Sequence, residues 1–539
     1  MTNDEIADRL LLFAALLELN GADAYACRAY RRGADVIRAA PVDIEELVRE
    51  GRVRELRGIG RSIEAKLREL VETGEIAELR ELEATLRPDL AALGRHLGLS
   101  ATRMLALCGA LGIETPDDLR AAAAAGRLRD APGIGAVTEQ RIVEALAREA
   151  RPRRGLRLDE SWELLSELAA RLGGAVAGDA RRYCPLCYDL AVVCASADPG
   201  ATLDRFAALP AIVTHLERGD GEAVGLTIEG LPVRLVVASP ETFGTALVRA
   251  TGSAAYVSAL EPLPDAPDED AVFAALGLQT PPPELRDEPV DVPADLVEIG
   301  DVRGDLHCHT TWSDGRSSVL EMAAAARDRG YEYLAICDHT PSVRVVPGLD
   351  ADALRRQGEE IDQANDQLAP FRVLKGIECD ILPDGSLDLA DAILERLDWV
   401  QISLHAGQRR SGAELTRIVS EAMRRPHVRA LSHPTGRILN YRPENALDLD
   451  EVYSVAVETG VALEINGLAS RLDLSAEHAR NAVRGGVRLV LGSDAHSAGG
   501  LRSIELAVRT ARRAGVRRPQ IVNGLALAEV LRRSASASR

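Results

Sequence analysis

Six histidines and three carboxylates recur at the ends of strand-like runs in the C-terminal part of the chain. These runs include GDLH, YLAICDH and RLVLGSDAH, and a barrel of parallel strands gathers their carboxyl ends at one mouth. The nine side chains are His307, His309, Asp314, His339, Glu378, His405, His433, Asp494 and His496. Nine nitrogen and oxygen donors exceed what one tetrahedral ion uses. The pattern therefore predicts a site for two or three divalent metal ions.

The donor types indicate both the ions and the reaction. Because no cysteine thiolate is among the expected ligands, Zn²⁺, Mn²⁺ or Fe²⁺ would suit the set. The neighbouring Cys308, Cys337 and Cys379 are expected to be small core residues. Clustered divalent ions activate water near neutral pH and stabilise the transition state of phosphate ester hydrolysis. The sequence thus predicts a metal-dependent phosphoesterase.

Three further polar residues follow the same strand-like runs. Arg437 in PTGR, Asn466 in EINGL and Arg471 in ASRLD are candidates for holding the phosphate through hydrogen bonds, which are charge-assisted for the arginines. The alternative is that they are solvated loop residues. His215 and His427 have no comparable neighbours, and we assign them no role.

The elements that must position these side chains are repeated βα units. From residue 301 to 539, seven strand-like runs alternate with helical segments. This length is close to the roughly 250 residues of a typical (β/α)-barrel. We therefore predict a C-terminal (β/α)7 barrel that carries the candidate ligands at its carboxyl-terminal mouth.

The beginning of the chain has a helical pattern instead. Apolar residues recur at helical spacing in IADRLLLFAALLEL, SIEAKLRELVE and EQRIVEALARE. Two Gly-Ile-Gly strings interrupt the helices, one at Gly58 and Gly60 before Arg61, the other at Gly133 and Gly135. Such glycines permit close backbone approach, and the amides that open the next helix point at an anion. This predicts helix-hairpin-helix modules that bind the DNA phosphate backbone; tight packing of two small helices is the alternative.

These patterns divide the chain into five segments. Residues 1–85 and 86–155 are expected to be helical, 156–260 to be an α+β domain, 261–300 to be an acidic, Pro-rich linker and 301–539 to be the barrel.

The net charge of −19 argues at first against a nucleic-acid partner, because phosphate binding needs cationic surface. The acidity is concentrated in residues 161–300, which carry 8 basic and 22 acidic side chains. Residues 1–160 carry 25 basic and 28 acidic side chains, and residues 301–539 carry 31 and 33. We therefore expect the two nearly neutral ends to meet DNA.

Composition also bears on the compartment. The first residues, MTNDEIADRL, are acidic where a signal peptide is basic and then apolar, and no run approaches 18 apolar residues. Eight cysteines in 539 residues are too sparse for a disulfide framework. We expect a reduced, cytoplasmic protein.

The motif order HxH…D…DH…GIE…H…H…SDAH over residues 303–513 resembles the PHP (polymerase and histidinol phosphatase) family. The resemblance implies three ion sites and a role for Asp338 in orienting a ligand histidine. One ion would be held by His307, His309, Glu378 and Asp494, a second by Glu378, His405 and His433, and a third by Asp314, His339 and His496.

With the helical segments in front of it, the whole chain resembles the bacterial family X DNA polymerases that carry a C-terminal PHP domain. The strings RAYRR at 28–32 and GIGRSIEAK at 58–66 are part of the resemblance. It implies that 1–85 is lyase-like, 86–155 fingers-like, 156–260 a palm and 261–300 a truncated thumb. In family members with 5′-deoxyribose phosphate lyase activity, the Lys66 position carries the Schiff-base amine, whereas a surface lysine is the alternative here.

The palm departs from the family where two Mg²⁺ ions should bind. Of three family aspartates, Asp189 keeps the first position, Ala191 stands at the second and Arg234 at the third. Asp179 replaces the serine that binds the triphosphate. One carboxylate cannot assemble a two-metal site, so we expect the palm to be catalytically inert.

These observations predict a 3′→5′ exonuclease or DNA 3′-end-processing enzyme of DNA repair whose polymerase activity is lost. The expected partner is gapped or nicked DNA, held through its phosphate backbone by a monomeric protein. Two alternatives stay open: a small-molecule phosphatase resembling histidinol phosphatase, and a non-enzymatic scaffold that binds DNA ends and uses the metals structurally.

Overall fold

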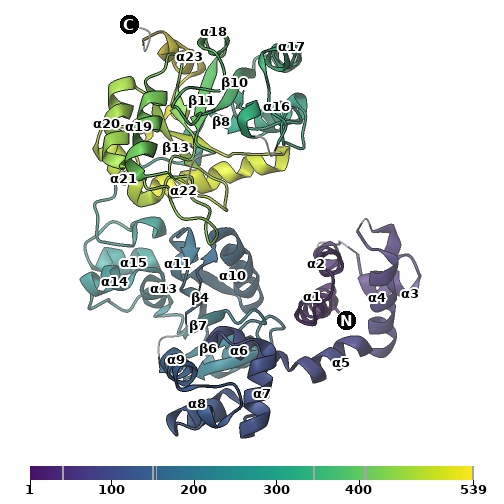
Figure 1. The fold of residues 1–539 in the computed structure, drawn as a ribbon. Helices are drawn as coiled ribbons and strands as arrows, with labels where there is room; N and C mark the ends of the chain where they lie inside the picture. The colour runs from purple at the N-terminus through teal and green to yellow at the C-terminus, as the bar shows by residue number, and fades with distance from the viewer. Residues whose placement is uncertain are drawn as a thin grey trace.

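The computed structural model describes residues 1–536 except 39, 41, 57, 148–150, 153, 344–345 and 406–409. A parallel barrel lies at one end of the molecule, a five-stranded sheet with its helices lies in the middle, and N-terminal helices occupy the other end and one side (Figure 1). Within the described residues, every helix falls short of the length or the apolar character that a bilayer crossing demands.

The N-terminal helices form two groups with separate cores, as the helical periodicity predicts. The first group is α1 (Asn3–Leu19), α2 (Ala24–Arg38), α3 (Ile44–Arg49), α4 (Arg61–Thr73) and α5 (Ala77–Leu86). The second is α6 (Pro88–Leu97), α7 (Ala101–Leu111), α8 (Pro116–Ala124) and α9 (Ala136–Ala147). Phe13 and Leu67 are buried in the first core, and Met104 and Ile142 in the second. In Figure 1, α5 bridges the space between α1–α4 and the rest.

The middle region is the predicted α+β domain. Its strands are β1 (Leu156–Arg157), β2 (Gly174–Ala177), β3 (Leu186–Cys187), β4 (Leu190–Ala195), β5 (Thr214–Arg218), β6 (Glu222–Leu226) and β7 (Pro232–Ala238). Its helices are α10 (Leu158–Leu172), α11 (Gly178–Arg181), α12 (Pro199–Ala207), α13 (Phe243–Thr251) and α14 (Ala254–Leu260). The main sheet has the order β2-β4-β7-β6-β5, with β4 and β7 parallel. Side chains from α10 and α12 cover one face of this sheet, and Leu247 of α13 packs on the other.

The segment 261–300, expected to be a linker or a truncated thumb, is docked against the middle region. It contains α15 (Glu269–Ala275) and the 3₁₀ helix η3 (Pro283–Leu285). Phe273 is buried against Val248 of α13. Arg286, 1% exposed, pairs with Glu269, and Arg181 lies 2.7 Å from the same carboxylate. A small apolar cluster and an ion-pair network therefore hold this acidic segment in place.

The C-terminal region is the predicted (β/α)7 barrel. Its strands are β8 (Gly304–Cys308), β9 (Tyr333–Ile336), β10 (Arg372–Asp380), β11 (Trp399–Ser403), β12 (Ala430–Leu431), β13 (Ala462–Asn466) and β14 (Leu489–Gly492). Its helices are α16 (Val319–Asp328), α17 (Ala351–Leu368), α18 (Asp391–Leu394), α19 (Gly412–Met423), α20 (Leu449–Thr459), α21 (Ala476–Arg484), α22 (Ile504–Arg513) and α23 (Leu527–Ser536). The strands pair in sequence order, all in parallel, and a bridge between Cys308 and Ala495 nearly closes the ring.

The barrel interior is a packed core below the mouth. Tyr333 and Trp399 fill it, and Val522 and Val530 from the C-terminal segment cover the opposite end. All three neighbouring cysteines of the predicted site are free and fully buried, as expected. Ligands can therefore enter only from the carboxyl-terminal mouth.

Helix α22 joins the barrel to the middle region (Figure 1). Arg509 and Arg512 of α22 both bind the carboxylate of Glu284 in η3. Leu472 of the barrel is buried in the core of the middle region. Charged and apolar contacts thus fix the two regions together.

Replacing Glu284 with alanine should destabilise this junction, because it leaves Arg512 without its buried partner. We expect a loss of about 3 kcal/mol, as for other buried ion pairs from which one partner is removed. Chemical denaturation followed by fluorescence would measure it. Glu288→Ala, at an exposed position of the same segment, is the matched control. Equal midpoints for the two variants would contradict the proposed importance of the Glu284 pair.

Candidate metal centre at the barrel mouth

The structure brings all nine side chains predicted as ligands to the mouth of the barrel. Each sits on the last residues of a strand or in the loop that follows it, where the backbone leaves the sheet. Most are buried, and the most exposed are Asp314, His405 and His496. Six strands, β8 to β12 and β14, thus deliver the set to one place although its first and last members are 189 positions apart.

Glu378, on β10, is the centre of the cluster. Its carboxylate is 1% exposed and lies 2.9 Å from both His339 Nδ1 and His433 Nε2. His307 Nε2 and His405 Nε2 follow at 3.7 and 3.8 Å. In the described part of the chain, neither oxygen of Glu378 has a hydrogen bond of good geometry. A buried, unpartnered carboxylate among imidazoles is costly unless cations bind it, so these residues fit metal ligation.

Two aspartates complete the donor set. His309 Nε2 lies 3.2 Å from Asp494 Oδ1, and His496 Nε2 lies 3.2 Å from Asp314 Oδ2. The His309 ring stacks between those of His339 and His496, with centroids 4.4 Å from each. His309 therefore contacts both the Asp494 carboxylate and the rings of His339 and His496.

Donor atoms within 4.8 Å of one another form three groups that differ in part from the three sets implied by the family resemblance. The groups are His309, Asp314, His339 and His496; His307, His309 and Glu378; and His339, Glu378 and His405. His309 and His339 each belong to two groups, because their rings lie between neighbouring carboxylates. His433 and Asp494 contact members of these groups.

The carboxylates and histidines of the cluster shift one another's pKa values. Although burial opposes it, nearby carboxylates raise the pKa of His339 to about 10 and that of His307 well above its usual value, so an ion that binds here must displace their protons. Burial opposes ionisation of Glu378, but His405, His307 and His339 hold the pKa of its carboxyl well below the usual range. Burial likewise opposes ionisation of Asp494, whose pKa is held low by His307 and His309. Burial, assisted by His339 and His496, lowers the pKa of His309 to about 3. Ionised carboxylates and neutral imidazoles are the protonation states that coordinate metal.

Glu464 on β13, which the sequence analysis did not identify, orients two ligands. One of its oxygens lies 2.7 Å from His307 Nδ1, and the other accepts a hydrogen bond of 2.7 Å from the His433 amide. The first contact turns Nε2 of His307 toward the cluster. The sequence signal was a carboxylate in the apolar run VALEIN, two residues before Asn466 and so on the same side of the strand.

Asp380 and Asp338 also support the site. Asp338 does so by a different contact from the expected one with a ligand histidine. Asp380 lies 3.3 Å from His405 Nδ1, so it is a second orienting carboxylate that the sequence analysis missed. Asp338 instead accepts hydrogen bonds from Thr310 and from Gln357. Successive residues at a strand end point to opposite sides, so Asp338 faces away from the cluster that His339 enters. Its function is to anchor the loop that carries Asp314, and the expectation that it orients a histidine is corrected.

The three candidate phosphate-binding residues have different surroundings. Asn466 donates to Asp494 Oδ2 at 3.0 Å and so positions that ligand. Arg437 donates to the Arg471 carbonyl at 3.0 Å and lies 3.2 Å from Glu444, which commits its guanidinium to the loop. Arg471 Nε lies 3.8 Å from Asp494 Oδ2, and its buried Nη1 has no hydrogen-bond partner among the described residues. Arg471 is thus the residue best placed to receive a phosphate.

The glycine hairpins of the helical region are exposed at the surface. Gly58 and Gly133 have φ angles of 113° and 81°, in the left-handed region that favours glycine. Gly60 precedes α4 and Gly135 precedes α9, and Gly60 provides no side-chain cap for α4. The first amides of α4, next to Arg61, therefore remain available to a phosphate oxygen.

Lys66 has a different environment from that of a nucleophilic amine. Its ammonium lies 2.9 Å from Glu78 and 3.5 Å from Glu69. Burial lowers the pKa of Lys66, but these carboxylates outweigh burial and raise it above the usual value. A raised pKa keeps the amine protonated, whereas Schiff-base chemistry needs the free base. The lyase role of Lys66 stays a prediction that this geometry does not favour.

In the middle region, an ion pair occupies the positions where the family resemblance implies catalytic aspartates. Ala191 on β4 is directly paired with Arg234 on β7. Arg234 Nη2 lies 3.1 Å from Asp189 Oδ2. Asp179 accepts hydrogen bonds from the amides of Tyr188 and Asp189. These carboxylates are thus engaged in holding the fold together.

Comparison with known proteins agrees with this architecture. Residues 1–76 match the model of a helix-hairpin-helix domain, 97–148 a SAM-like helix-hairpin-helix tandem, and 305–467 the PHP domain. Fold and site together define a DNA-binding protein with a metal-dependent, phosphoesterase-type PHP barrel.

A protein of Bacillus subtilis named DNA polymerase/3′-5′ exonuclease PolX is 30% identical over 98% of this chain and 99% of its own length. The chain therefore belongs to the bacterial family X DNA polymerases with a C-terminal PHP domain. Shorter relatives named probable phosphatase, from Syntrophotalea carbinolica and Acetivibrio thermocellus, are 34% and 33% identical over 41% and 36% of this chain. The matched segments cover 90% and 78% of the lengths of these two relatives.

Replacing Glu378 with glutamine should lower the metal content more than any other single change, because its carboxylate contacts five of the six histidines. We expect at least half of the bound divalent ions to be lost, as measured by mass spectrometry of protein dialysed against Mn²⁺ or Zn²⁺. Glu359→Gln, at an exposed position of α17, is the control. Wild-type metal content in the Glu378 variant would contradict the central position of this residue.

Proposed function

We propose that the protein is a 3′→5′ exonuclease or DNA 3′-end-processing enzyme that acts in DNA repair and has lost polymerase activity. The observation that carries this proposal is the complete cluster of nine donors around the unpartnered carboxylate of Glu378. The helix-hairpin-helix regions and the PolX relative support DNA as the substrate.

The residues of the mouth have separate tasks in this reaction. Divalent ions bound there would activate water and neutralise charge on the phosphate in the transition state. Arg471 holds a phosphate oxygen through its buried, unpartnered Nη1. Asn466 and Glu464 keep Asp494 and His307 in place. Preorganised groups of this kind stabilise the transition state without moving during the reaction.

The middle region supports the loss of polymerase activity. Arg234 puts a positive charge where a metal ligand is needed, and its salt bridge uses the remaining carboxylate of Asp189. Burial raises the pKa of Asp189, which further weakens it as a cation ligand. The acidic segment 161–300 would also repel a nucleoside triphosphate.

For the DNA partner, we propose gapped or nicked duplex bound by a monomer. The exposed hairpins at Gly58–Gly60 and Gly133–Gly135 suit contacts to the phosphates of two duplex segments. Val137 follows the second hairpin where a basic residue is usual in the family, and this weakens the second contact. The proposed ions are Mn²⁺, Zn²⁺ or Fe²⁺.

The relatives named probable phosphatase favour a second candidate, hydrolysis of a small phosphate monoester. Their similarity is confined to a part of the chain about the size of the barrel, so they share its chemistry but not the helical regions. The two candidates predict opposite substrate preferences. A DNA-end scaffold without enzymatic activity is the third outcome that the same assays distinguish.

A nuclease and phosphatase panel tests the proposal. With Mn²⁺, wild-type protein should shorten 5′-labelled gapped DNA from its 3′ end and prefer it to histidinol phosphate and nitrophenyl phosphate. His433→Ala and His307→Ala should lower the rate at least 100-fold, because each removes a donor to the ions. His427→Asn, at the far end of the barrel, should retain the wild-type rate. Efficient hydrolysis of the small monoesters alone would establish the phosphatase, and no hydrolysis at all would leave the scaffold.

Primer extension tests the palm separately. We expect no Mg²⁺-dependent incorporation of deoxynucleotides on a gapped template, because Asp189 alone cannot hold two ions. His307→Ala protein should be used in parallel, so that exonucleolytic removal of new nucleotides cannot conceal synthesis. Extension by that variant would contradict the proposed loss of polymerase activity.

A further inference from the structure

A cavity of about 570 Å³ opens between the middle region and the barrel. One wall comes from the start of α10 and the turn after α11, and the other from residues 468–470 and from helix α22 with the turn before it. Neither the metal cluster nor the palm residues discussed above lie in this cavity. Its lining nevertheless combines the two kinds of side chain that bind single-stranded nucleic acid: aromatic rings and arginines.

The aromatic part is Trp162 stacked on Tyr183. Their ring centroids are 5.2 Å apart, and the ring planes differ by 21°. Trp162 is 36% exposed although tryptophan is usually highly buried. Tyr183 has a φ of 56°, an uncommon conformation for a residue other than glycine, so its surroundings hold the ring in this position. An exposed, pre-stacked aromatic surface is a platform on which a base can stack.

The cationic part comes from α22 and the turn before it. Arg509 lies 4.7 Å from the centroid of the Tyr183 ring. Arg502 is exposed and has no ion pair within the described residues. The carboxylates that line the cavity are engaged: Asp159 pairs with Arg157, and Glu505 pairs with Arg329. Arg509 also pairs with Glu284, so the unpaired charge at this cavity is that of Arg502, although the middle region as a whole is acidic.

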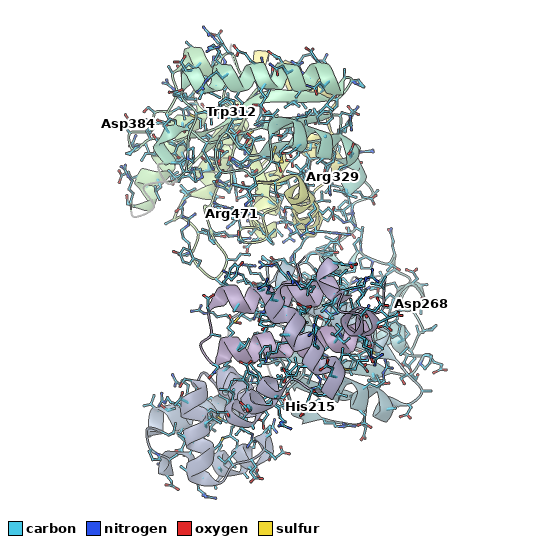
Figure 2. All side chains as sticks on the ribbon, turned by 90° about the vertical axis from the view of Figure 1, so that its right-hand side faces the viewer. His215, Asp268, Trp312, Arg329, Asp384 and Arg471 are labelled. Carbon is cyan, nitrogen blue, oxygen red and sulfur yellow. The ribbon has the colours of Figure 1, made fainter. Side chains whose placement is uncertain are left out.

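One wall of the cavity belongs to the loop that also reaches the metal centre. Residues 468–470 form part of its wall, and Arg471, the next residue, reaches Asp494 in the cluster. Figure 2 shows Arg471 at the edge of the barrel that faces the middle region. The loop from Asn466 to Leu472 thus has the phosphate-binding arginine on one side and the aromatic platform on the other.

We propose that this cavity binds the last unpaired nucleotides of a DNA 3′ strand, with a base stacked on Trp162 and a phosphate bound by Arg502. The strand then passes the 468–470 wall, and its 3′-terminal phosphodiester meets Arg471 at the metal centre. This inference rests on the proposed exonuclease function and adds a specificity: a short single-stranded 3′ end is the preferred substrate. The aromatic platform positions DNA and takes no part in the hydrolysis.

Binding in EDTA tests the proposal without hydrolysis. The probes are a blunt DNA hairpin and the same hairpin with four thymidines at its 3′ end, both 5′-labelled for anisotropy. The tail should strengthen binding to the full-length protein about tenfold, which is the usual order for a stacked base. Trp162→Ala should remove this gain, and Trp162→Phe should retain most of it. A gain that persists in Trp162→Ala would overturn the proposal.

Salt dependence tests Arg502. In titrations with the tailed hairpin, Arg502→Gln should reduce the slope of log affinity against log salt by about 0.7, as expected for one lost phosphate contact to a single strand. Arg488→Gln is the matched control, since Arg488 is also exposed and lies before β14, at the opposite end of the barrel. Equal slopes for the two variants would contradict the role of Arg502.

Hydrolysis assays separate failure of this inference from failure of the proposed function. With Mn²⁺, the loss of rate in Trp162→Ala should be larger for the tailed hairpin than for a nitrophenyl ester of thymidine monophosphate, which is too short to span the platform. If wild type and Trp162→Ala degrade the tailed hairpin equally well, the platform is wrong and the exonuclease stands. If the tail strengthens binding through Trp162 but DNA is not cut, the exonuclease is wrong and the platform stands.

Discussion

The burial of the Glu378 carboxylate among five imidazoles is the constraint on which the barrel mouth depends. A buried anion without hydrogen bonds is expensive, and only nearby cations can offset that cost. The surrounding groups are arranged accordingly: Glu464 turns His307 inward, Asp380 holds His405, and Asp338 anchors the loop of Asp314. These contacts fix the donors before any ion arrives. A mouth built in this way is preorganised for metal ions, because little ordering of the ligands remains to be done.

At the positions where the family resemblance places three catalytic aspartates, the middle region has Asp189, Ala191 and Arg234. Asp189 and Arg234 face each other across β4 and β7, so an internal ion pair stands where metal ions would otherwise neutralise the carboxylates. Asp179 likewise serves the backbone amides of Tyr188 and Asp189. Such substitutions preserve stability because each buried charge has a partner. The region is therefore suited to act as a scaffold that carries the barrel on α22.

The net charge of −19 has a structural explanation once the regions are in place. Much of the acidity of segment 161–300 is used internally, as in the pairs of Glu284 with Arg512 and of Glu269 with Arg286. Arg502 has no carboxylate partner among the described residues, and Arg471 has a buried Nη1 without a hydrogen bond; both border the junction of the middle region and the barrel. The total charge thus says little about where a polyanion can bind. The local distribution of charged side chains at this junction favours polyanion binding.

The sequence by itself determined the elements and the ligand types, because both follow from local patterns. Helical and strand periodicity predicted the helical, α+β and barrel parts of the chain, and the histidines at strand ends predicted the cluster of ligands. Only the tertiary structure decided the functions of residues that act across elements. The sequence does not distinguish the three carboxylates Glu464, Asp380 and Asp338, yet each supports a different part of the site. Arg437 and Arg471 likewise differ in the atoms that their guanidinium groups reach: Arg437 binds loop carbonyls, whereas Nη1 of Arg471 has no hydrogen bond among the described residues. Side-chain direction and long-range contacts set these roles, and neither is encoded in local spacing.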